Sequence, residues 1–287
     1  MQYRTIGDVA VSAIGLGGMP MSIEGRPDRA RSVATIHAAL DAGITLIDTA
    51  DAYSLGGPEV GHNEELIAEA LGSYGGDASG VLVATKGGHL RPGDGTWTIN
   101  GDPAYLIEAA RASVRRLGVD AIGLYQHHRP DPSVPYEDSI GALKTLLDSG
   151  TIRMAGISNA SVAQIKIAQG ILGDALVSVQ NHFSPVFLST RDTLDYCAEQ
   201  GLAFLPWSPL GGIGHGAALS DNAVIAELAA GHGVSPQRVV LAWELSLAPV
   251  VIPIPGASRP ESIVDDAAAA ELVLTTDEQE RIAASLA

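Results

Sequence analysis

The sequence predicts a single α/β domain over residues 1–287, folded as a (β/α)8 barrel of the TIM type. Eight apolar runs of strand length alternate with segments of helical periodicity, a pattern that favours a parallel sheet buried on both faces. Eight such units close most naturally into a barrel, which commonly needs about 250 residues. The predicted strands are Ala13–Leu16, Ile44–Ile47, Val81–Thr85, Ala121–Gln126, Ile152–Ile157, Leu176–Gln180, Leu202–Trp207 and Val250–Ile254.

Helix signals occupy the segments between these runs. The clearest segment has an apolar stripe at offsets of three and four residues, and it opens on Asp102-Pro103, a capping side chain followed by a proline at the first helical position. Ser235-Pro236 opens another helix in the same way. The stripe consists of Leu106, Ala109, Ala110, Val114 and Leu117, and two capping boxes are predicted, Ser161 with Gln164 and Thr276 with Gln279.

Three further elements are expected beyond the eight units. Tyr3–Ile6 and Val9–Val11 flank Gly7-Asp8 and predict an N-terminal β-hairpin at the bottom of the barrel. A helix around Asn222–Ala230 follows the seventh strand, and an extra helix ends the chain. An open doubly wound sheet is the alternative fold. Its first turn usually reads Gly-x-Gly-x-x-Gly, whereas this chain has Gly15-Leu16-Gly17-Gly18-Met19-Pro20.

Composition narrows the class of protein. The formal charge of −16 argues against nucleic acid and anionic membranes as partners, because like charges repel. Pro249, Pro253 and Pro255 interrupt the longest apolar stretch, and the N-terminus lacks a secretory pattern. The single cysteine, Cys197, is expected to be a small buried hydrophobe on a helix. We therefore expect a cytoplasmic protein acting on a small molecule. A monomer is compatible with the sequence, which leaves the oligomeric state open.

Four side chains able to exchange protons follow three of the predicted strands. Asp48 and Tyr53 come after the second run, Lys86 ends the third, and His128 closes the fourth. The carboxyl ends of parallel strands share one rim, where barrel active sites lie, so these groups should converge. His127 should face the opposite side of the strand and make an ordinary polar contact. The four converging groups suit delivery of a proton to a carbonyl oxygen.

The roles of the four groups can be assigned from their chemistry. Tyrosine is a weak acid near neutrality, with an ordinary pKa of about 10. We expect the Lys86 ammonium to lower the pKa of Tyr53, while Asp48 keeps Lys86 charged and aimed at the phenol. A neutral imidazole at His128 can then donate a hydrogen bond to the substrate oxygen and orient it.

The motifs around these residues resemble the Asp-Tyr-Lys-His tetrad of the aldo-keto reductases. The likeness runs in order along nearly the whole chain. It implies reduction of an aldehyde or ketone by hydride transfer from NADPH, with Tyr53 as the general acid, and it selects His128 as the catalytic histidine. The matching segments are residues 48–53, 84–87, 124–129, 156–159, 180–181, 207–210 and 254–257.

The resemblance also implies a cofactor site. Ser158, Asn159 and Gln180 would hold the nicotinamide carboxamide, since an amide and a hydroxyl can satisfy both its donor and its acceptor. Trp207 would stack on the nicotinamide ring. The loop after the seventh strand would cover the pyrophosphate. Further expected cofactor contacts are Ser208, Pro209, Leu210, Gly211 and Gly214 in that loop, and Gly18 and Met19 after the first strand.

The chain departs from the family pattern at the end of the eighth strand, where members grip the adenosine phosphate. Gly256 and Ser262 stand where many have lysine and arginine, and Asp265-Asp266 stands where Glu-Asn contacts adenine. Arg259 with Ser258 remains as the clamp for a 2′-phosphate. NADP is therefore the expected cofactor, with NADPH favoured and NAD as the alternative.

The substrate pocket is expected to be lined by Met21, His89, Trp97, Arg129 and Phe183.

Three other functions stay open. The chain could be an NAD(P)-linked dehydrogenase that oxidises a sugar or other alcohol, a cofactor-binding redox sensor or regulatory subunit, or a metal hydrolase. Its histidines show no ligand-spaced pair, so no metal is expected.

Overall fold

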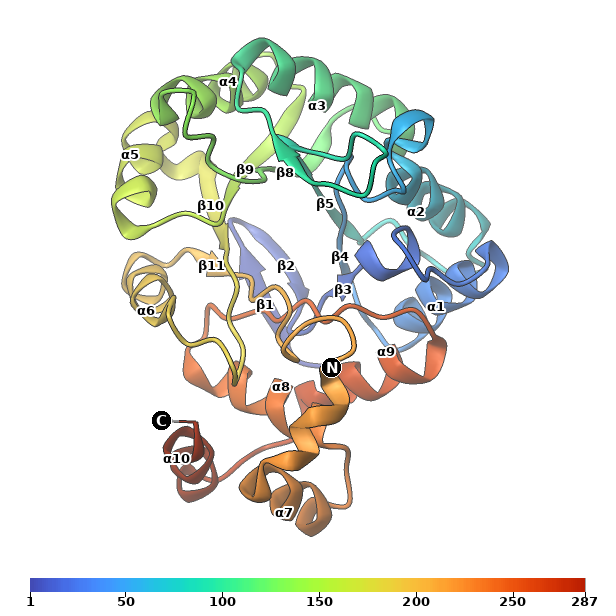
Figure 1. Cartoon of the computed structure of the whole chain (residues 1–287), viewed down its shortest axis with the longest axis vertical. Coiled ribbons are helices and arrows are strands. Elements are labelled where there is room, and N and C mark those ends of the chain that lie inside the picture. The colour runs from blue at the N-terminus through green and yellow to red at the C-terminus, as the bar shows by residue number, and fades with distance from the viewer. Residues whose placement is uncertain (287) are drawn as a thin grey trace.

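The computed structural model describes residues 1–286 and shows a curled sheet surrounded by helices (Figure 1). The strands of this sheet are β3 (Leu16–Gly17), β4 (Leu46–Asp48), β5 (Leu82–Gly87), β8 (Ile122–His127), β9 (Ile152–Ser158), β10 (Leu176–Gln180) and β11 (Ala203–Phe204). They form a seven-stranded sheet in the order β11-β10-β9-β8-β5-β4-β3, and every neighbouring pair is parallel. The predicted α/β barrel is confirmed.

The predicted eighth strand closes the barrel through single bridges and is not a regular strand. Val251 in this segment bridges β11 at Phe204, and Gly256, two residues beyond the predicted strand, bridges β3 at Gly17. The reason is the alternation of Pro253 and Pro255 with isoleucines. The isoleucines donate their N–H groups toward β11. The prolines have no N–H group, so on the side of β3 they only accept, and their carbonyl oxygens lie 2.9 Å from the amide nitrogens of Gly15 and Gly17.

A helix follows each of the eight strand positions and covers the outside of the barrel. Trp243 and other apolar side chains of these helices pack against the outer face of the sheet. These helices are α1 (Arg29–Asp41), α2 (His62–Ser73), α3 (Pro103–Leu117), α4 (Tyr136–Asp148), α5 (Val162–Leu172), α6 (Arg191–Gln200), α8 (Pro236–Leu247) and α9 (Pro260–Ala267).

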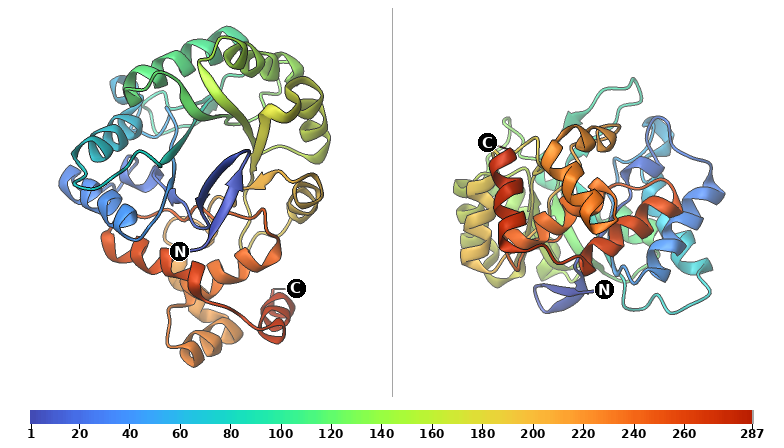
Figure 2. Two further views of the ribbon diagram at one scale, coloured as in Figure 1. Left: turned by 180° about the vertical axis from the view of Figure 1, so that it is seen from behind. Right: turned by 90° about the horizontal axis from the view of Figure 1, so that it is seen from below.

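The N-terminal hairpin lies across one end of the barrel, as predicted (Figure 2). It consists of β1 (Tyr3–Ile6) and β2 (Val9–Ser12), paired antiparallel. Ile6 and Val11 are fully buried in the cluster inside the barrel, together with apolar residues of the strands. The hairpin therefore closes the end opposite the carboxyl ends of the strands, and only the other end can hold a site.

The two extra helices are also confirmed. α7 (Ala223–His232) follows β11, and α10 (Thr276–Ser285) ends the described chain; both lie outside the ring in Figure 1. The capping box of α10 is one residue earlier than predicted. Thr275 accepts from the Glu278 amide, and the Glu278 carboxylate accepts from the Thr275 amide. A carboxylate is a stronger acceptor than the amide of Gln279, which favours this register.

The other predicted helix starts agree with the structure. Asp102, Ser161 and Ser235 each accept a hydrogen bond from a first-turn amide of the helix that they begin. Cys197 is buried on α6, where burial raises the pKa of its thiol to about 12. No helix within residues 1–286 is both long and apolar enough to cross a membrane.

Candidate active site

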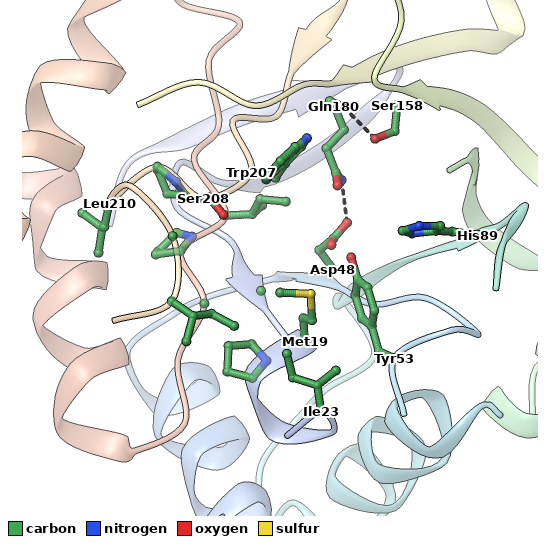
Figure 3. A pocket seen from close by; sticks show the side chains of 18 of the residues that line it. Met19, Ile23, Asp48, Tyr53, His89, Ser158, Gln180, Trp207, Ser208 and Leu210 are labelled. Atoms are coloured by element: carbon green, nitrogen blue, oxygen red, sulfur yellow. Dashed lines mark hydrogen bonds between the residues drawn. The ribbon is translucent and has the colours of Figure 1, made fainter. Parts of the chain in front are cut away.

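The four predicted catalytic side chains meet at the open end of the barrel. Asp48 ends β4, Lys86 lies near the end of β5, and His128 directly follows β8. The parallel register places Asp48 beside Ala84, two residues before Lys86, so both side chains project from the same face of the sheet. Tyr53 reaches the group from the turn after β4, and Figure 3 shows its ring beside Asp48.

Lys86 is fully buried, and each of its three ammonium protons has an acceptor. Its Nζ lies 2.6 Å from Asp48 Oδ1, 2.8 Å from the Thr49 carbonyl oxygen and 3.2 Å from the Tyr53 hydroxyl oxygen. An ammonium has three donors, so this geometry satisfies it completely. The lysine is therefore held in one position against the phenol.

Two amides hold the other oxygen of Asp48. The Nε2 atom of Gln180 donates to Asp48 Oδ2 at 2.7 Å (Figure 3), and the Nε2 atom of Gln126 donates at 3.3 Å. These contacts fix the carboxylate from the side away from Lys86. Sequence reasoning missed Gln126. The sequence could have indicated Gln126, because it lies two residues before His128 and strand alternation places both side chains on the same face of β8.

Burial and charge act in opposite directions on the phenol and the lysine. Burial alone would lower the pKa of Lys86, but the Asp48 carboxylate and Tyr53 outweigh it, so the pKa is raised and the ammonium persists. Burial raises the pKa of Tyr53 above its ordinary value, and Lys86 offsets this only in part. The predicted lowering of the Tyr53 pKa is therefore wrong for the protein alone. The phenol is deeply buried, and Asp48 cancels part of the field of Lys86.

His128 is neutral near pH 7. Burial and the nearby positive charges, Lys86 foremost, hold the pKa of its imidazole well below the ordinary range. Its ring meets that of Tyr53 edge to face, with centroids 5.7 Å apart, and that of His89 at 4.9 Å. A neutral imidazole can still donate one hydrogen bond, as predicted from the sequence.

His127 faces away from the site, as strand alternation requires, but the predicted polar contact is wrong. Its ring is buried against Tyr136, and neither ring nitrogen has a hydrogen-bond partner within the described chain. Burial lowers the pKa of His127 to about 4, so the ring stays neutral.

Asp51, two residues before Tyr53, is a second buried carboxyl that sequence reasoning did not single out. Burial and the neighbouring Glu64 raise its pKa to about 8. One oxygen lies 3.4 Å from the Tyr105 hydroxyl, and the other has no partner among residues 1–286. Asp51 is therefore largely protonated near pH 7, which limits the negative charge behind Tyr53.

A cavity of about 870 Å³ opens beside the four groups. Asp48, Tyr53 and His128 line it, whereas Lys86 lies behind them. Seventeen positions proposed from the sequence line this cavity: Asp48, Tyr53, His128, Met19, His89, Trp97, Arg129, Ser158, Asn159, Gln180, Trp207, Ser208, Pro209, Leu210, Gly214, Gly256 and Ser258. Gly212, Ile213 and Gly216 also line it and belong to the loop that was expected to cover the pyrophosphate. Lining residues that were not proposed as contacts from the sequence are Gly17, Pro20, Ile23, Ile99, Ile254 and Pro255.

Two predicted substrate contacts lie in the core instead. Phe183 is fully buried and packs on Phe204 and Trp243, so it does not reach the cavity. Met21 is buried under the loop after β3, with Leu66 and Ile36 in the same cluster. In both cases the chain turns after a strand, and strand alternation no longer determines the direction of the side chain.

One end of the cavity carries the predicted nicotinamide contacts. Asn159 Nδ2 donates to the His128 carbonyl oxygen at 3.1 Å, and its Oδ1 accepts from Trp207 Nε1 at 3.2 Å. Ser158 Oγ donates to the main-chain oxygen of Gln180 at 2.7 Å (Figure 3). Because Nε2 of Gln180 is held by Asp48, Oε1 is left as a free acceptor within the described chain. Asn159 thus connects the histidine strand to the tryptophan.

Trp207 presents a supported aromatic face. The ring of His182 stacks on it with centroids 4.2 Å apart, and Phe187 stacks on the other side of His182 at 4.1 Å. Trp207 also lines the cavity, so the face away from His182 is available to a flat ring.

Backbone strain concentrates in the same region. The non-glycine residues with positive φ within residues 1–286 are Asn159 at 57° and Ser208 at 52°. Such conformations are uncommon and cluster at functional sites. The loop that begins at Ser208 contains Gly211 and Gly212 at φ 89° and 107°, angles that favour glycine, and Gly212 lines the cavity whereas Gly211 does not.

The residues predicted at the adenosine end lie partly outside the cavity. Ser258 lines it, but Arg259 is exposed and donates from Nε to Ser262 Oγ at 2.7 Å. Asp265 pairs with Arg238 at 2.5 Å and faces α8, not the cavity. Asp266 is buried, and burial together with Asp265 raises its pKa to about 7. Gly18, expected after the first strand as a cofactor contact, is not among the residues that line the cavity.

Comparison with known proteins identifies the family. The sequence model of the aldo/keto reductase family matches residues 13–287. The chain belongs to this family. An uncharacterized oxidoreductase of Schizosaccharomyces pombe is 35% identical to this aldo-keto reductase over 276 residues, which are 95% of this chain and 86% of that protein. The protein is accordingly an oxidoreductase.

Solved structures of aldo-keto reductases share the whole fold. The glycerol dehydrogenase of Gluconobacter oxydans superposes with a TM-score of 0.84 at 27% identity, covering 99% of this chain and 94% of that one. An aldo-keto reductase of Klebsiella pneumoniae, solved in complex with NADPH, superposes with a TM-score of 0.81 at 27% identity, covering 98% and 94% of the two chains.

Proposed function

We propose that this aldo-keto reductase reduces an aldehyde or ketone to the alcohol with a reduced nicotinamide cofactor, and that Tyr53 is the general acid. The observation that carries the proposal is the buried Lys86 ammonium, 3.2 Å from the hydroxyl of Tyr53, which lines the cavity together with His128. A buried ion pair such as Lys86 with Asp48 is weak evidence for stability, so a catalytic reason for it is favoured.

The roles follow from the contacts. Tyr53 is fully protonated near pH 7 because its pKa is raised, which is the form that can give a proton. As the proton leaves, the phenolate that forms is stabilised by the ammonium of Lys86, which is already in place and needs no rearrangement. His128, neutral and beside the Tyr53 ring, donates a hydrogen bond to the substrate oxygen and aligns it.

Asp48 acts through Lys86. Its Oδ1 accepts from the ammonium while Gln180 and Gln126 hold Oδ2, so the lysine cannot turn away from the phenol. The carboxylate also keeps Lys86 protonated in a buried site, since burial alone would favour the neutral amine. Asp48 is therefore a positioning residue in this scheme.

The cavity residues beside the four groups fit a nicotinamide dinucleotide, since Gln180 contacts Asp48 and Asn159 contacts the main chain of His128. When bound, such a cofactor supplies the hydride that reaches the carbonyl carbon. Trp207 offers the stacking face, and the free Oε1 of Gln180 with the side chain of Asn159 would hold the carboxamide. The glycine loop beginning at Ser208 would cover the pyrophosphate. The related Klebsiella pneumoniae enzyme was solved with NADPH, which supports this assignment.

We propose NADPH as the favoured cofactor. Arg259 is exposed next to Ser258, which lines the cavity, and a guanidinium can contact a 2′-phosphate with two hydrogen bonds. The negative charge of Asp265, which would otherwise repel a phosphate, is balanced by Arg238. Exchanging Arg259 for methionine should then raise the KM for NADPH and leave that for NADH nearly unchanged.

The opposite direction of reaction has one observation in its favour. The related Gluconobacter oxydans protein is a glycerol dehydrogenase, so oxidation of an alcohol by NAD(P) is the second candidate. A panel of aldehydes, ketones and polyols, tested with NADPH, NADH, NADP and NAD by nicotinamide absorbance, distinguishes the two. Faster reduction than oxidation at neutral pH supports the reductase. Absence of turnover in either direction contradicts both assignments.

A further inference from the structure

The substrate end of the cavity carries an arginine without an acidic partner. Arg129 directly follows His128, is half-buried and lines the cavity. Its Nε atom is buried with no hydrogen-bond partner, and it forms no ion pair with any residue of the described chain. The other two cations near this end are already paired, Lys86 with Asp48 and Arg91 with Glu24.

The charges around Arg129 do not compensate it. His128 and His89 line the cavity with Arg129, and burial together with nearby cations, Arg129 among them, lowers the pKa of both, that of His89 to about 4. Both rings are therefore neutral near pH 7. Asp48 is neutralised by the Lys86 ammonium at 2.6 Å. The net charge of this end is positive, although the whole chain carries −16.

The wall next to Arg129 is aromatic and apolar. His89 stacks on Trp97 with ring centroids 4.7 Å apart. The guanidinium of Arg91 also lies over Trp97, 4.4 Å from the ring centroid. Ile99 and Ile23 add apolar side chains to the lining of the cavity. A substrate that fits this end has a hydrocarbon or aromatic middle, a carbonyl at Tyr53 and a group that satisfies a guanidinium.

We propose that Arg129 binds an oxyanion on the substrate, so that the preferred substrates are carbonyl compounds that bear a carboxylate or a phosphate. This rests on the proposed reductase function. A guanidinium offers a planar pair of N–H donors to such an anion, and pairing relieves the buried, unsatisfied Nε. Neutral aldehydes leave Arg129 without a partner in the complex, which costs binding energy.

Matched substrates test the proposal. The first pair is 4-carboxybenzaldehyde with its methyl ester, which differ in charge but share the ring and aldehyde. The second pair, 4-formylphenyl phosphate with 4-methoxybenzaldehyde, keeps the aromatic ring and separates a phosphate from a carboxylate as the anion. We expect kcat/KM of the wild-type protein to favour the anionic member of at least one pair by about tenfold or more, the range of a charge-assisted hydrogen bond.

Variants locate the effect at Arg129. Arg129→Met should bring the anionic-to-neutral ratio of kcat/KM close to one, whereas Arg129→Lys should keep part of it, because lysine retains the charge but not the fork. Arg31→Met, at an exposed position of α1, removes the same charge far from the cavity and should leave the ratio as in wild type. An equal ratio in Arg31→Met and Arg129→Met would overturn the proposal.

Binding gives a readout that is independent of turnover. Benzoate added to the NADP-saturated protein should change the tryptophan fluorescence, since Trp97 adjoins the site, and benzamide should bind more weakly. If neutral aldehydes are reduced but neither the anionic substrates nor benzoate is preferred, the role of Arg129 is wrong and the reductase function stands. If no carbonyl compound is reduced at all, the function itself fails, and this inference with it.

Discussion

The buried ammonium of Lys86 lies 3.2 Å from the hydroxyl oxygen of Tyr53, and no part of the lysine side chain is exposed to solvent. The two residues belong to different βα units and are 33 positions apart in the chain. Their contact therefore depends on the barrel register and not on local sequence. The contact places the Lys86 ammonium where it can stabilise the phenolate that forms when Tyr53, the proposed acid, loses its proton.

Replacing Tyr53 by phenylalanine should remove the acid without disturbing the cavity. We expect kcat for aldehyde reduction to fall by at least about a hundredfold, the usual contribution of a positioned general acid. NADPH should still quench the fluorescence of Trp207 at similar concentrations, because the substitution removes only the phenol hydroxyl and leaves Trp207 and the rings stacked behind it in place. Tyr74→Phe, which removes an exposed hydroxyl bonded to Asp41, is the matched control. Near-normal turnover by Tyr53→Phe would rule out this phenol as the acid.

Removing one member of the Lys86 and Asp48 pair should destabilise the fold more than removing both. Lys86→Met leaves a buried carboxylate without its cation, which costs about 3–5 kcal/mol in the free energy of unfolding. The double variant Asp48→Asn with Lys86→Met removes both charges and should recover most of that loss in urea titrations. It should nevertheless stay as inactive as Lys86→Met alone. Equal stability of single and double variants would show that the pair is not coupled.

The neutral state of His128 predicts the shape of the pH profile. Its pKa is lowered well below the ordinary value of about 6.5, so the imidazole gains a proton only at much more acidic pH. We expect kcat/KM for reduction to show no inflection near pH 6.5. His128→Gln keeps a neutral hydrogen-bond donor and should lower the rate while leaving the profile unchanged in shape. An inflection near pH 6.5 that disappears in His128→Gln would contradict this state.

The part of the site whose geometry follows from the order of the strands could be predicted from the sequence. Asp48, Lys86 and His128 end successive parallel strands, so their convergence needs only the rule that those ends share a rim. Trp207 and Asn159 were placed by resemblance to the family, and both line the cavity. The barrel itself followed from the repeated alternation of strands and helices.

Other features depend on how deeply a side chain is buried and which way it points, and the pattern of residues along the chain does not determine either. The Tyr53 pKa moves opposite to the prediction because burial exceeds the effect of Lys86, and burial is a property of the packed structure. Phe183 was assigned to the pocket although it turns into the core after β10. The partner of Asp265 is Arg238, 27 positions away on α8, a contact that no local motif indicates.

Glu244 provides a last test, of stability and its dependence on pH. Its side chain is fully buried in α8, and both carboxyl oxygens lack hydrogen-bond partners within residues 1–286. Burial raises the pKa of Glu244 well above its ordinary value. The folded state therefore holds this proton more tightly than the unfolded state. Its contribution to stability is fully present below the unfolded pKa, and it is lost as pH rises toward the folded pKa.

Glu244→Met keeps the length of the side chain and removes the carboxyl. We expect the free energy of unfolding to rise by about 1–3 kcal/mol at pH 7, because an unsatisfied buried polar group is removed, and the gain over wild type should be larger at pH 8 than at pH 5. Urea titrations at the three pH values measure this difference. Glu280→Met, at an exposed position of α10, is the control and should show no pH-dependent gain. Glu244 does not line the cavity, so kcat of Glu244→Met should match that of wild type. A gain in stability that does not change with pH would mean that the fold does not hold the carboxyl protonated.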